Sequence, residues 1–311
     1  MKIFFYGSPP WAIPSLQKIV ESGHEVALVI TQPDRPSGRG RHAGVSAVKA
    51  AALNMGLPIH QPVKIRKDSF ILEKLEEQKP DLNVVVAYGQ IIQASVIYFP
   101  PFHSLNLHFS LLPSYRGAAP VQWALYHGER TTGVSIFELN EKMDEGKILA
   151  QKKVYIQKNE DAIRLQSRLS EIGSDLLVAT ISNIDKITPV EQDNSLATYA
   201  PLIKKEDGRI NWQKTASEIS NHVRAFHPWP SSFCFFKKQR IKLISVSPLD
   251  ESPSPDKAYG KIWDIRSEGI SILCGGPSLL LVKRLQPENK KEMDAYSFCL
   301  GADVKPGDRF L

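Results

Sequence analysis

The sequence predicts an α/β protein of two domains, in which a doubly wound, mostly parallel sheet is followed by a small β domain. Three observations carry this prediction. The chain has 311 residues, which is long for one average domain and fits two. In its first half, short apolar runs alternate with segments of helical spacing, as in a sheet whose strands are connected by helices. In its last third, short strand-like runs follow one another with turn residues between them, as in a small β-barrel or sandwich.

The apolar runs of the first half are the expected strands of the sheet. Leu82–Ala87 (LNVVVA) is nearly continuous, as expected for a strand that is covered on both faces. The other expected strands are Lys2–Tyr6, Glu25–Thr31, Pro58–Gln61, Ser104–Phe109, Gly133–Leu139 and Leu149–Ile156.

The segments between these runs have helical spacing. We expect a charged amphipathic helix over Asp68–Gln78, with Asp68 as its N-cap. The other expected helices are Trp11–Ser22, Val45–Met55, Ala119–Tyr126, Glu160–Ile184 and Thr215–Ala225.

A mixed, polar stretch with Pro189 and Pro201 separates the two halves. We therefore expect an N-terminal domain over residues 1–189, a linker over 190–207 and a C-terminal domain over 208–311. The strands expected in the C-terminal domain are Ser232–Phe236, Arg240–Val246, Gly260–Ile265, Gly269–Cys274 and Leu279–Leu285.

Composition excludes several classes of protein. Hydrophobic residues make up 42% and charged residues 23%, which is ordinary for a globular protein. The cysteines Cys234, Cys274 and Cys299 form no CxxC pair, so a zinc ribbon, a dithiol site and a disulfide framework are disfavoured, and we expect no metal. No apolar run approaches the roughly 20 residues of a membrane helix, and the N-terminus has no signal-peptide pattern. We therefore expect a cytoplasmic protein without a membrane partner.

Charge is concentrated in the last third. Residues 208–311 hold 16 Lys and Arg against 11 Asp and Glu, an excess of five within a net charge of +6. Such an excess suits a polyanionic partner, and it also suits a basic surface that is merely solvated.

Two nucleotide-binding motifs are missing. The first expected strand ends in Gly7-Ser8-Pro9-Pro10, whereas a dinucleotide fingerprint needs glycines whose backbone amides meet the pyrophosphate. The Gly-rich run Ser37–Arg41 lacks the Lys-Ser/Thr pair of a P-loop, and neither HExxH nor GxSxG occurs. Nicotinamide chemistry and P-loop phosphate transfer are therefore disfavoured.

Two polar residues of one expected strand are candidate catalytic residues. In Leu105–Phe109, Asn106 and His108 share a face, because residues i and i+2 of a strand point to the same side. Ligands of open α/β sheets bind at the carboxyl ends of strands, where this pair lies. Asp144 follows a later strand in a turn, with Gly146 available for a position of positive φ.

An Asn, a His and an Asp can together transfer an acyl group to an amine. Asn106 can donate a hydrogen bond to the oxyanion that forms on the attacked carbonyl, a contact worth roughly 10²–10³ in rate. Asp144 can hold the imidazole of His108 or steer the proton that leaves the amine. Because direct attack by the amine suffices, no covalent intermediate is required. The sequence leaves open whether His108 or Asp144 takes the proton.

These residues stand in an ordered pattern: Asn106-x-His108, Ser110-Leu111-Leu112-Pro113, Arg116–Gln122 and Asp144 in Met-Asp-x-Gly. The pattern resembles that of the folate-dependent formyltransferases. The resemblance implies a Rossmann-like N-terminal domain and 10-formyltetrahydrofolate as formyl donor. It further implies that Asn106, His108 and Asp144 are the catalytic triad, and that the folate is bound by Ser110, Leu111, Leu112, Pro113, Val86, Ala87, Tyr88 and Gly89, the last four lining the pterin pocket.

Four further segments resemble members of this family whose acceptor is initiator methionyl-tRNA, namely Thr31–Gly40, Ala197–Pro201, Arg224–Pro230 and Leu285–Met293. By this resemblance, the C-terminal domain is similar to an OB-fold barrel that helps to hold tRNA, and the product serves translation initiation. Arg35, Arg39 and Arg41 lie among glycines in the loop that these enzymes press against the tRNA, and we expect them to contact it. We expect a monomer.

Three other activities are compatible with parts of this pattern. A sugar-nucleotide N-formyltransferase would share the triad but would not need the arginine loop or a basic C-terminal domain. A formyl-folate hydrolase would use the same triad on water, with no use for that domain. A non-catalytic RNA-binding module would leave Asn106, His108 and Asp144 unexplained.

Overall fold

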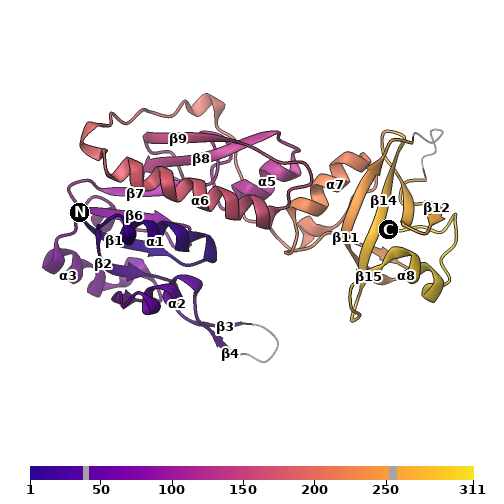
Figure 1. Ribbon diagram of the computed structural model, residues 1–311, viewed down its shortest axis with the longest axis horizontal. Helices are drawn as coiled ribbons and strands as arrows, with labels where there is room; N and C mark the ends of the chain where they lie inside the picture. The colour runs from indigo at the N-terminus through magenta and orange to yellow at the C-terminus, as the bar shows by residue number, and fades with distance from the viewer. Residues whose placement is uncertain (38–41, 252–257) are drawn as a thin grey trace. The chain divides into compact units, whose positions relative to one another are not determined.

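The computed structural model describes residues 1–37, 42–251 and 258–311, and Figure 1 shows the order of its elements. The chain forms two compact units. The first comprises residues 1–120, 131–155 and 166–200, and the second comprises 121–130, 156–165 and 201–311.

A seven-stranded sheet forms the centre of the first unit, in the order β5-β2-β1-β6-β7-β8-β9. The first five strands of this order run parallel, whereas the β7–β8 and β8–β9 pairs are antiparallel. The expected mostly parallel sheet is therefore confirmed. The strands are β1 (Lys2–Gly7), β2 (Glu25–Ile30), β5 (Ile59–His60), β6 (Leu82–Val86), β7 (Ser104–His108), β8 (Thr131–Glu138) and β9 (Ile148–Tyr155).

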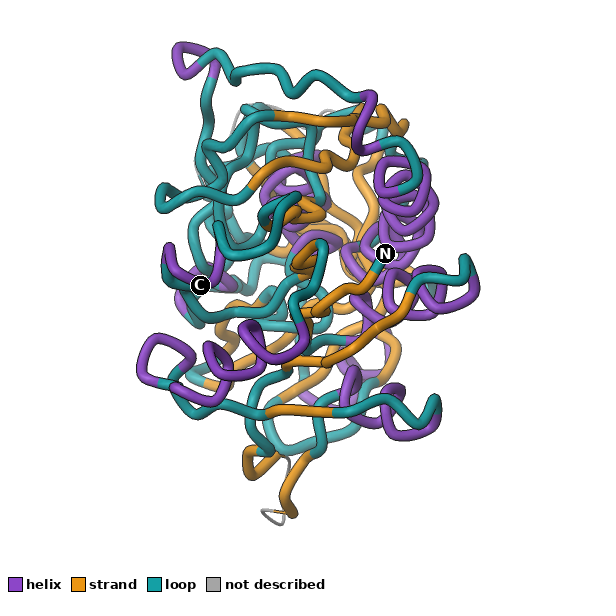
Figure 2. The backbone as a smooth tube through the Cα atoms, turned by 90° about the vertical axis from the view of Figure 1, so that its left-hand side faces the viewer, coloured by secondary structure: helices purple, strands orange, loops and turns teal. Residues whose placement is uncertain are grey.

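Helices lie on both sides of these strands (Figure 2). Alternate residues of β1 point to the same face of the sheet, and on one face Phe4 and Tyr6 pack with Ile71 and Leu75 of α3 in one apolar cluster. On α6, Gly173 lies close to Leu107 of β7. Between residues 1 and 200 the helices and 3₁₀ turns are η1 (Pro10–Ala12), α1 (Ile13–Glu21), α2 (Ala47–Asn54), η2 (Ile65–Lys67), α3 (Ser69–Gln78), α4 (Ala94–Ile97), α5 (Pro120–Tyr126), α6 (Ala162–Ile181), η3 (Ile184–Lys186) and η4 (Asn194–Leu196). Of these, α5 after Pro120 and the start of α6 up to Leu165 belong to the second unit.

Local chemistry fixes the ends of several helices. The side chain of Asp68 accepts the backbone N–H of Ile71, so the expected N-cap of α3 is confirmed. Ser46 caps α2 in the same way, through the N–H of Lys49.

A short antiparallel hairpin of β3 (Arg35–Ser37) and β4 (His42–Gly44) leaves the first unit after β2, where the sequence had predicted no strand. Asp34 anchors its base, because the carboxylate accepts hydrogen bonds from Lys49 Nζ at 2.5 Å and from Gln61 Nε2 at 2.9 Å.

An antiparallel sheet of β10-β11-β14-β13-β12, with β15 paired to β14, forms the second unit. The segment 308–311 joins its two edges: Leu311 exchanges two backbone hydrogen bonds with Phe235 of β10, and Asp308 accepts one from Ile262 of β12. The sheet therefore closes into a barrel-like form through the end of the chain. The elements are η5 (Glu206–Gly208), α7 (Ala216–Ala225), β10 (Phe233–Phe236), β11 (Gln239–Leu249), β12 (Ile262–Arg266), β13 (Gly269–Cys274), β14 (Ser278–Pro287), β15 (Met293–Asp294) and α8 (Ala295–Ala302).

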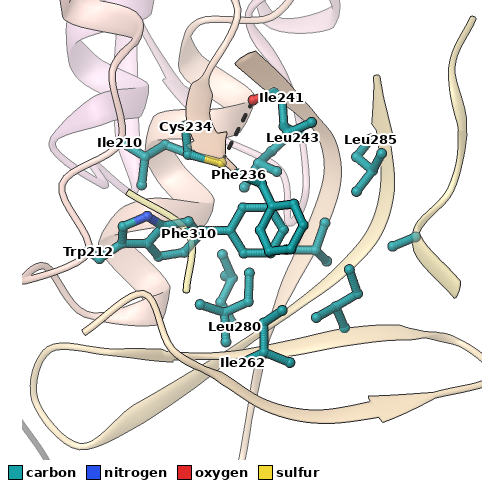
Figure 3. Close-up of a cluster of buried hydrophobic side chains, with 14 of the residues drawn as sticks. Ile210, Trp212, Cys234, Phe236, Ile241, Leu243, Ile262, Leu280, Leu285 and Phe310 are labelled. Carbon is teal, nitrogen blue, oxygen red and sulfur yellow. Dashed lines mark hydrogen bonds between the residues drawn. The ribbon is translucent and has the colours of Figure 1, made fainter. Parts of the chain in front are cut away.

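The inside of this sheet holds an apolar core, part of which is drawn in Figure 3. Trp212, Phe236 and Phe310 meet there, and Phe236 lies 5.1 Å from Phe310 between ring centroids. The three cysteines are buried and free. Burial raises the pKa of the Cys299 thiol to about 11, so it behaves as a small apolar side chain.

Candidate active site

The imidazole of His108 lies at the carboxyl end of β7. The residue is only 6% exposed. Its Nε2 is 2.9 Å from the backbone carbonyl oxygen of Tyr115, which can only accept, so Nε2 carries a proton. Its Nδ1 faces the Asp144 carboxylate at 3.7 Å, which is beyond hydrogen-bond distance. The structure thus brings together two of the three residues of the expected triad.

Asn106 lies two residues before His108 on the same strand and is half-buried. Within residues 1–37, 42–251 and 258–311, its side-chain amide has no hydrogen-bond partner. A half-buried amide with free donors beside a His–Asp pair suits the binding of a carbonyl oxygen.

Asp144 lies in the turn after β8 with a φ of 52°, which is left-handed. Its Oδ2 accepts a hydrogen bond of 2.8 Å from the backbone N–H of Gly117. The expectation of a positive φ at Gly146 is wrong, because Asp144 takes that conformation. Gly146 is required for another reason: a Cβ there would lie 1.7 Å from the carbonyl oxygen of Glu138.

The segment Ser110–Pro113 follows His108 directly, and its backbone is held from several sides. The Ser135 hydroxyl donates to Ser110 O at 2.7 Å and accepts from Leu112 N at 3.1 Å, while Gln151 Nε2 donates to Leu112 O at 2.9 Å. Ser110 and Leu112 are buried, whereas Leu111 and Pro113 are partly exposed. Leu111 and Pro113 are therefore the side chains of this segment that a ligand can reach.

The segment Val86–Gly89 leaves the end of β6 and turns sharply, with φ values of 49° at Ala87 and 79° at Gly89. Ala87 and Gly89 are exposed, while Val86 and Tyr88 are buried. Burial, with a smaller contribution from Asp68, raises the pKa of the Tyr88 phenol, which remains neutral. Its ring packs edge-on against Tyr6, 5.7 Å away, so Tyr88 supports this turn from within the core.

Of the three arginines expected to contact tRNA, the structure describes only Arg35. Arg39 and Arg41 lie outside the residues that the structure describes, and Arg35 is described only as part of the backbone of β3.

Two buried polar side chains beside the triad were not predicted from the sequence. Arg116 is 1% exposed, and Gln192 is 9% exposed. Arg116 donates to Gln192 Oε1 from Nε at 3.1 Å and from Nη2 at 2.8 Å. The only signal for Arg116 was its place within the family pattern, and Gln192 lies in a stretch that was expected to be a linker.

The outward face of β10 and β11 was also not predicted from the sequence. Phe233 and Phe235 alternate there with buried residues, and their register partners are Lys242 and Arg240. The guanidinium of Arg240 lies 3.8 Å from the ring centroid of Phe233, and that of Arg209 lies 5.8 Å from Phe235. We call these five residues the basic-aromatic face.

Comparison with known proteins gives the family. The sequence model described as Formyl transferase matches residues 1–181, and the one described as Formyl transferase, C-terminal domain, matches residues 202–303. The methionyl-tRNA formyltransferase of Thermodesulfovibrio yellowstonii is 41% identical over 98% of this chain and 97% of its own. That of Synechococcus sp. (strain JA-2-3B'a(2-13)) is 42% identical over 100% of this chain and 98% of its own. This chain belongs to the methionyl-tRNA formyltransferase family.

The fold agrees with that membership. A solved N-formyltransferase from Helicobacter canadensis, in complex with folinic acid and dTDP-3-aminofucose, superposes with a TM-score of 0.68. The two are 20% identical, and the match covers 91% of this chain and 98% of the other, so this likeness concerns the fold. In the described part of the chain, no group of three or more His, Cys, Asp or Glu side chains could hold a metal ion. No helix among the described residues is long and apolar enough to cross a membrane.

Proposed function

We propose that this protein transfers the formyl group of 10-formyltetrahydrofolate to the free amino group of methionine on initiator methionyl-tRNA. The observation that carries this proposal is membership of the methionyl-tRNA formyltransferase family at 41% identity over nearly the whole chain. The product is N-formylmethionyl-tRNA, which serves translation initiation. The enzyme would act in the cytoplasm, as a monomer, where charged initiator tRNA is used.

The reaction forms one bond and breaks one bond at the formyl carbon, and it moves one proton between two nitrogens. The amine nitrogen of methionine attacks the formyl carbon, and the bond between that carbon and N10 of the folate breaks. The amine loses a proton and N10 gains one, so tetrahydrofolate leaves. No covalent intermediate with the enzyme is needed.

The side chains around His108 suit these changes. Asn106 would donate a hydrogen bond to the formyl oxygen as charge develops on it, since its amide has no other partner in the described part of the chain. His108 and Asp144 would together remove the proton from the amine, and their separation of 3.7 Å leaves the pair able to close around a substrate proton. Binding of both substrates in one site would supply much of the remaining rate.

The folate would lie along the exposed parts of the two segments beside the triad. Leu111 and Pro113 would contact it from one segment, and Ala87 and Gly89 from the other. Ser110, Leu112, Val86 and Tyr88 would act by holding these backbones, because their own side chains are buried.

The tRNA would be held by Arg35, Arg39 and Arg41, and by the C-terminal domain. On that domain the basic-aromatic face supports the proposal, because cations stacked on aromatic rings suit phosphates and unpaired bases. We place the catalytic domain at residues 1–189, the linker at 190–207 and the tRNA-binding domain at 208–311.

Replacement of the triad acid tests this proposal. Asp144→Ala should lower the rate of formyl transfer by several orders of magnitude and leave the fold intact by circular dichroism. Near-normal transfer by a folded Asp144→Ala protein would contradict the role of the triad. Transfer by the wild type to an amino-sugar nucleotide in place of tRNA would identify a sugar-nucleotide N-formyltransferase.

A further inference from the structure

The conformation of Asp144 requires support from its surroundings. A non-glycine residue at a φ of 52° is disfavoured, so it keeps this conformation only where neighbouring groups fix it. Gly117 holds the carboxylate from one side, through its backbone N–H at 2.8 Å. The backbone of the turn needs a second attachment.

The side-chain amide of Gln192 supplies that attachment. Its Nε2 donates to the carbonyl oxygen of Asp144 at 2.9 Å and to that of Gly146 at 2.7 Å. Both hydrogens of one amide nitrogen therefore bind the two ends of the Asp144 turn. A buried amide that is fully bonded resists reorientation, because each lost hydrogen bond would leave a polar group without a partner.

Arg116 fixes which way this amide points. Two of its guanidinium nitrogens donate to Gln192 Oε1, so the amide nitrogen must face the turn. The same guanidinium donates to Asn194 Oδ1 at 2.8 Å, and its Nη1 lies 3.5 Å from a carboxylate oxygen of Glu145. The Arg116 guanidinium is only 1% exposed, and a buried charge is stable only when it is paired and hydrogen-bonded. Its partners are Gln192, Asn194 and Glu145.

The neighbours of Arg116 in the chain complete a ring of contacts. The carbonyl of Tyr115 accepts from His108, and the amide of Gly117 donates to Asp144. The backbone of Arg116 is tied to the segment after Gln192, donating to Thr198 O at 2.8 Å and accepting from Ala200 N at 2.7 Å. The segment 192–200 therefore braces both sides of the His–Asp pair.

We propose that Gln192 is a positioning residue for formyl transfer, which holds the Asp144 carboxylate toward His108 and is itself oriented by Arg116. This inference rests on the proposed function. The stretch around Gln192, which the sequence predicts to be a linker, would then contribute to the geometry of the active site.

Two substitutions separate positioning from simple loss of stability. Gln192→Glu keeps an oxygen acceptor for Arg116 and removes both N–H donors to the turn. Gln192→Met keeps the length of the side chain and removes every hydrogen bond. A matched control is Asn83→Ala, because Asn83 is fully buried and its amide likewise makes two donor contacts, to Val96 O at 2.8 Å and Ser104 Oγ at 3.1 Å.

The test is kcat and KM for formyl transfer to initiator methionyl-tRNA, with thermal unfolding of each variant measured alongside. Gln192→Glu should lower kcat by about 10²-fold, a loss that a misplacement of about 1 Å can cause, while KM for 10-formyltetrahydrofolate stays within about three-fold. Asn83→Ala should lower the unfolding temperature without this loss of kcat. A folded Gln192→Met protein should show the same loss of kcat. If Gln192→Met does not fold, the kcat of Gln192→Glu alone tests the positioning role.

A double-mutant cycle gives the readout that a structural role would not move. If Gln192 acts through Asp144, Gln192→Glu should have almost no further effect in an Asp144→Ala background. An equal fold-loss in both backgrounds, or an unchanged kcat in Gln192→Glu, would overturn the inference. Absence of transfer by the wild type would overturn the proposed function instead, so the two failures are distinguishable.

Discussion

Acidification from pH 7 to pH 5 should weaken the second unit through His222. This residue is 4% exposed in α7. Its Nε2 lies 2.9 Å from the carbonyl oxygen of Asp207, and its Nδ1 lies 2.7 Å from the Ser232 hydroxyl. Burial lowers the pKa of His222 to about 4, against the opposing effect of Asp207 and with a smaller contribution from Lys214. The folded protein therefore holds a neutral imidazole.

The sign and size of the effect follow from linkage. Between pH 6.5 and pH 4 the unfolded chain binds a proton at His222 and the folded protein does not, so the free energy of unfolding falls as pH falls through this window. The full loss is about 3 kcal/mol, at 1.36 kcal/mol for each pKa unit. From pH 7 to pH 5 the loss is about 2 kcal/mol, and below pH 4 this group adds nothing further.

Urea unfolding followed by tryptophan fluorescence measures this loss. Trp123, Trp212, Trp229 and Trp263 belong to the second unit, and Trp11 belongs to the first. A Trp11→Phe background therefore confines the signal to the second unit. In that background, His222→Gln should remove about 2 kcal/mol of the difference between pH 7 and pH 5. An identical pH dependence with and without His222 would show that this residue does not destabilise the second unit at low pH.

Three further predictions concern the site and the tRNA. Gly117→Ala should lower kcat by about 10²-fold, because a Cβ there would lie 2.6 Å from the Ala200 carbonyl oxygen and displace the amide that holds Asp144. The control is Gly23→Ala, which is also at positive φ but has no atom within 4 Å of the added Cβ, and equal kinetics of the two variants would contradict the role of the Gly117 amide. Arg39→Ala should raise KM for tRNA and leave folate affinity unchanged, and the reverse pattern would exclude Arg39 as a tRNA contact. Arg240→Ala should weaken binding of initiator and elongator tRNA alike and reduce the salt dependence of log Kd by about one unit, whereas an unchanged slope would remove the basic-aromatic face from the tRNA path.

Most strands and helices could be predicted because local pattern and tertiary environment agree in them. Leu82–Val86 is a continuous apolar run and lies in the middle of the sheet. The hairpin β3–β4 could not be predicted, since Arg35-Pro36-Ser37 and His42-Ala43-Gly44 have neither apolar alternation nor strand propensity. Helix α8 was also missed: Ala295–Ala302 is apolar nearly throughout and lacks a polar face, and the cap at Asp294 is its one strong signal.

In the candidate site too, some residues could be predicted from the sequence and others could not. Asn106 and His108 share a strand face by the two-residue period, and the carboxyl end of a strand is where such folds bind ligands. That Asp144 approaches His108 depends on the antiparallel return of β8 beside β7, which no local pattern indicates. Gln192 was missed because its two partners, Arg116 and the Asp144 turn, lie 76 and 48 residues away in sequence.

The most direct test of the central claim is transfer of a labelled formyl group from 10-formyltetrahydrofolate to methionyl-tRNA, with initiator and elongator tRNA compared side by side. We expect rapid labelling of the initiator alone. Loss of formyl-folate without labelled tRNA would indicate a hydrolase, and tRNA binding without any turnover would indicate a non-catalytic RNA-binding protein. Either result would contradict the proposed function.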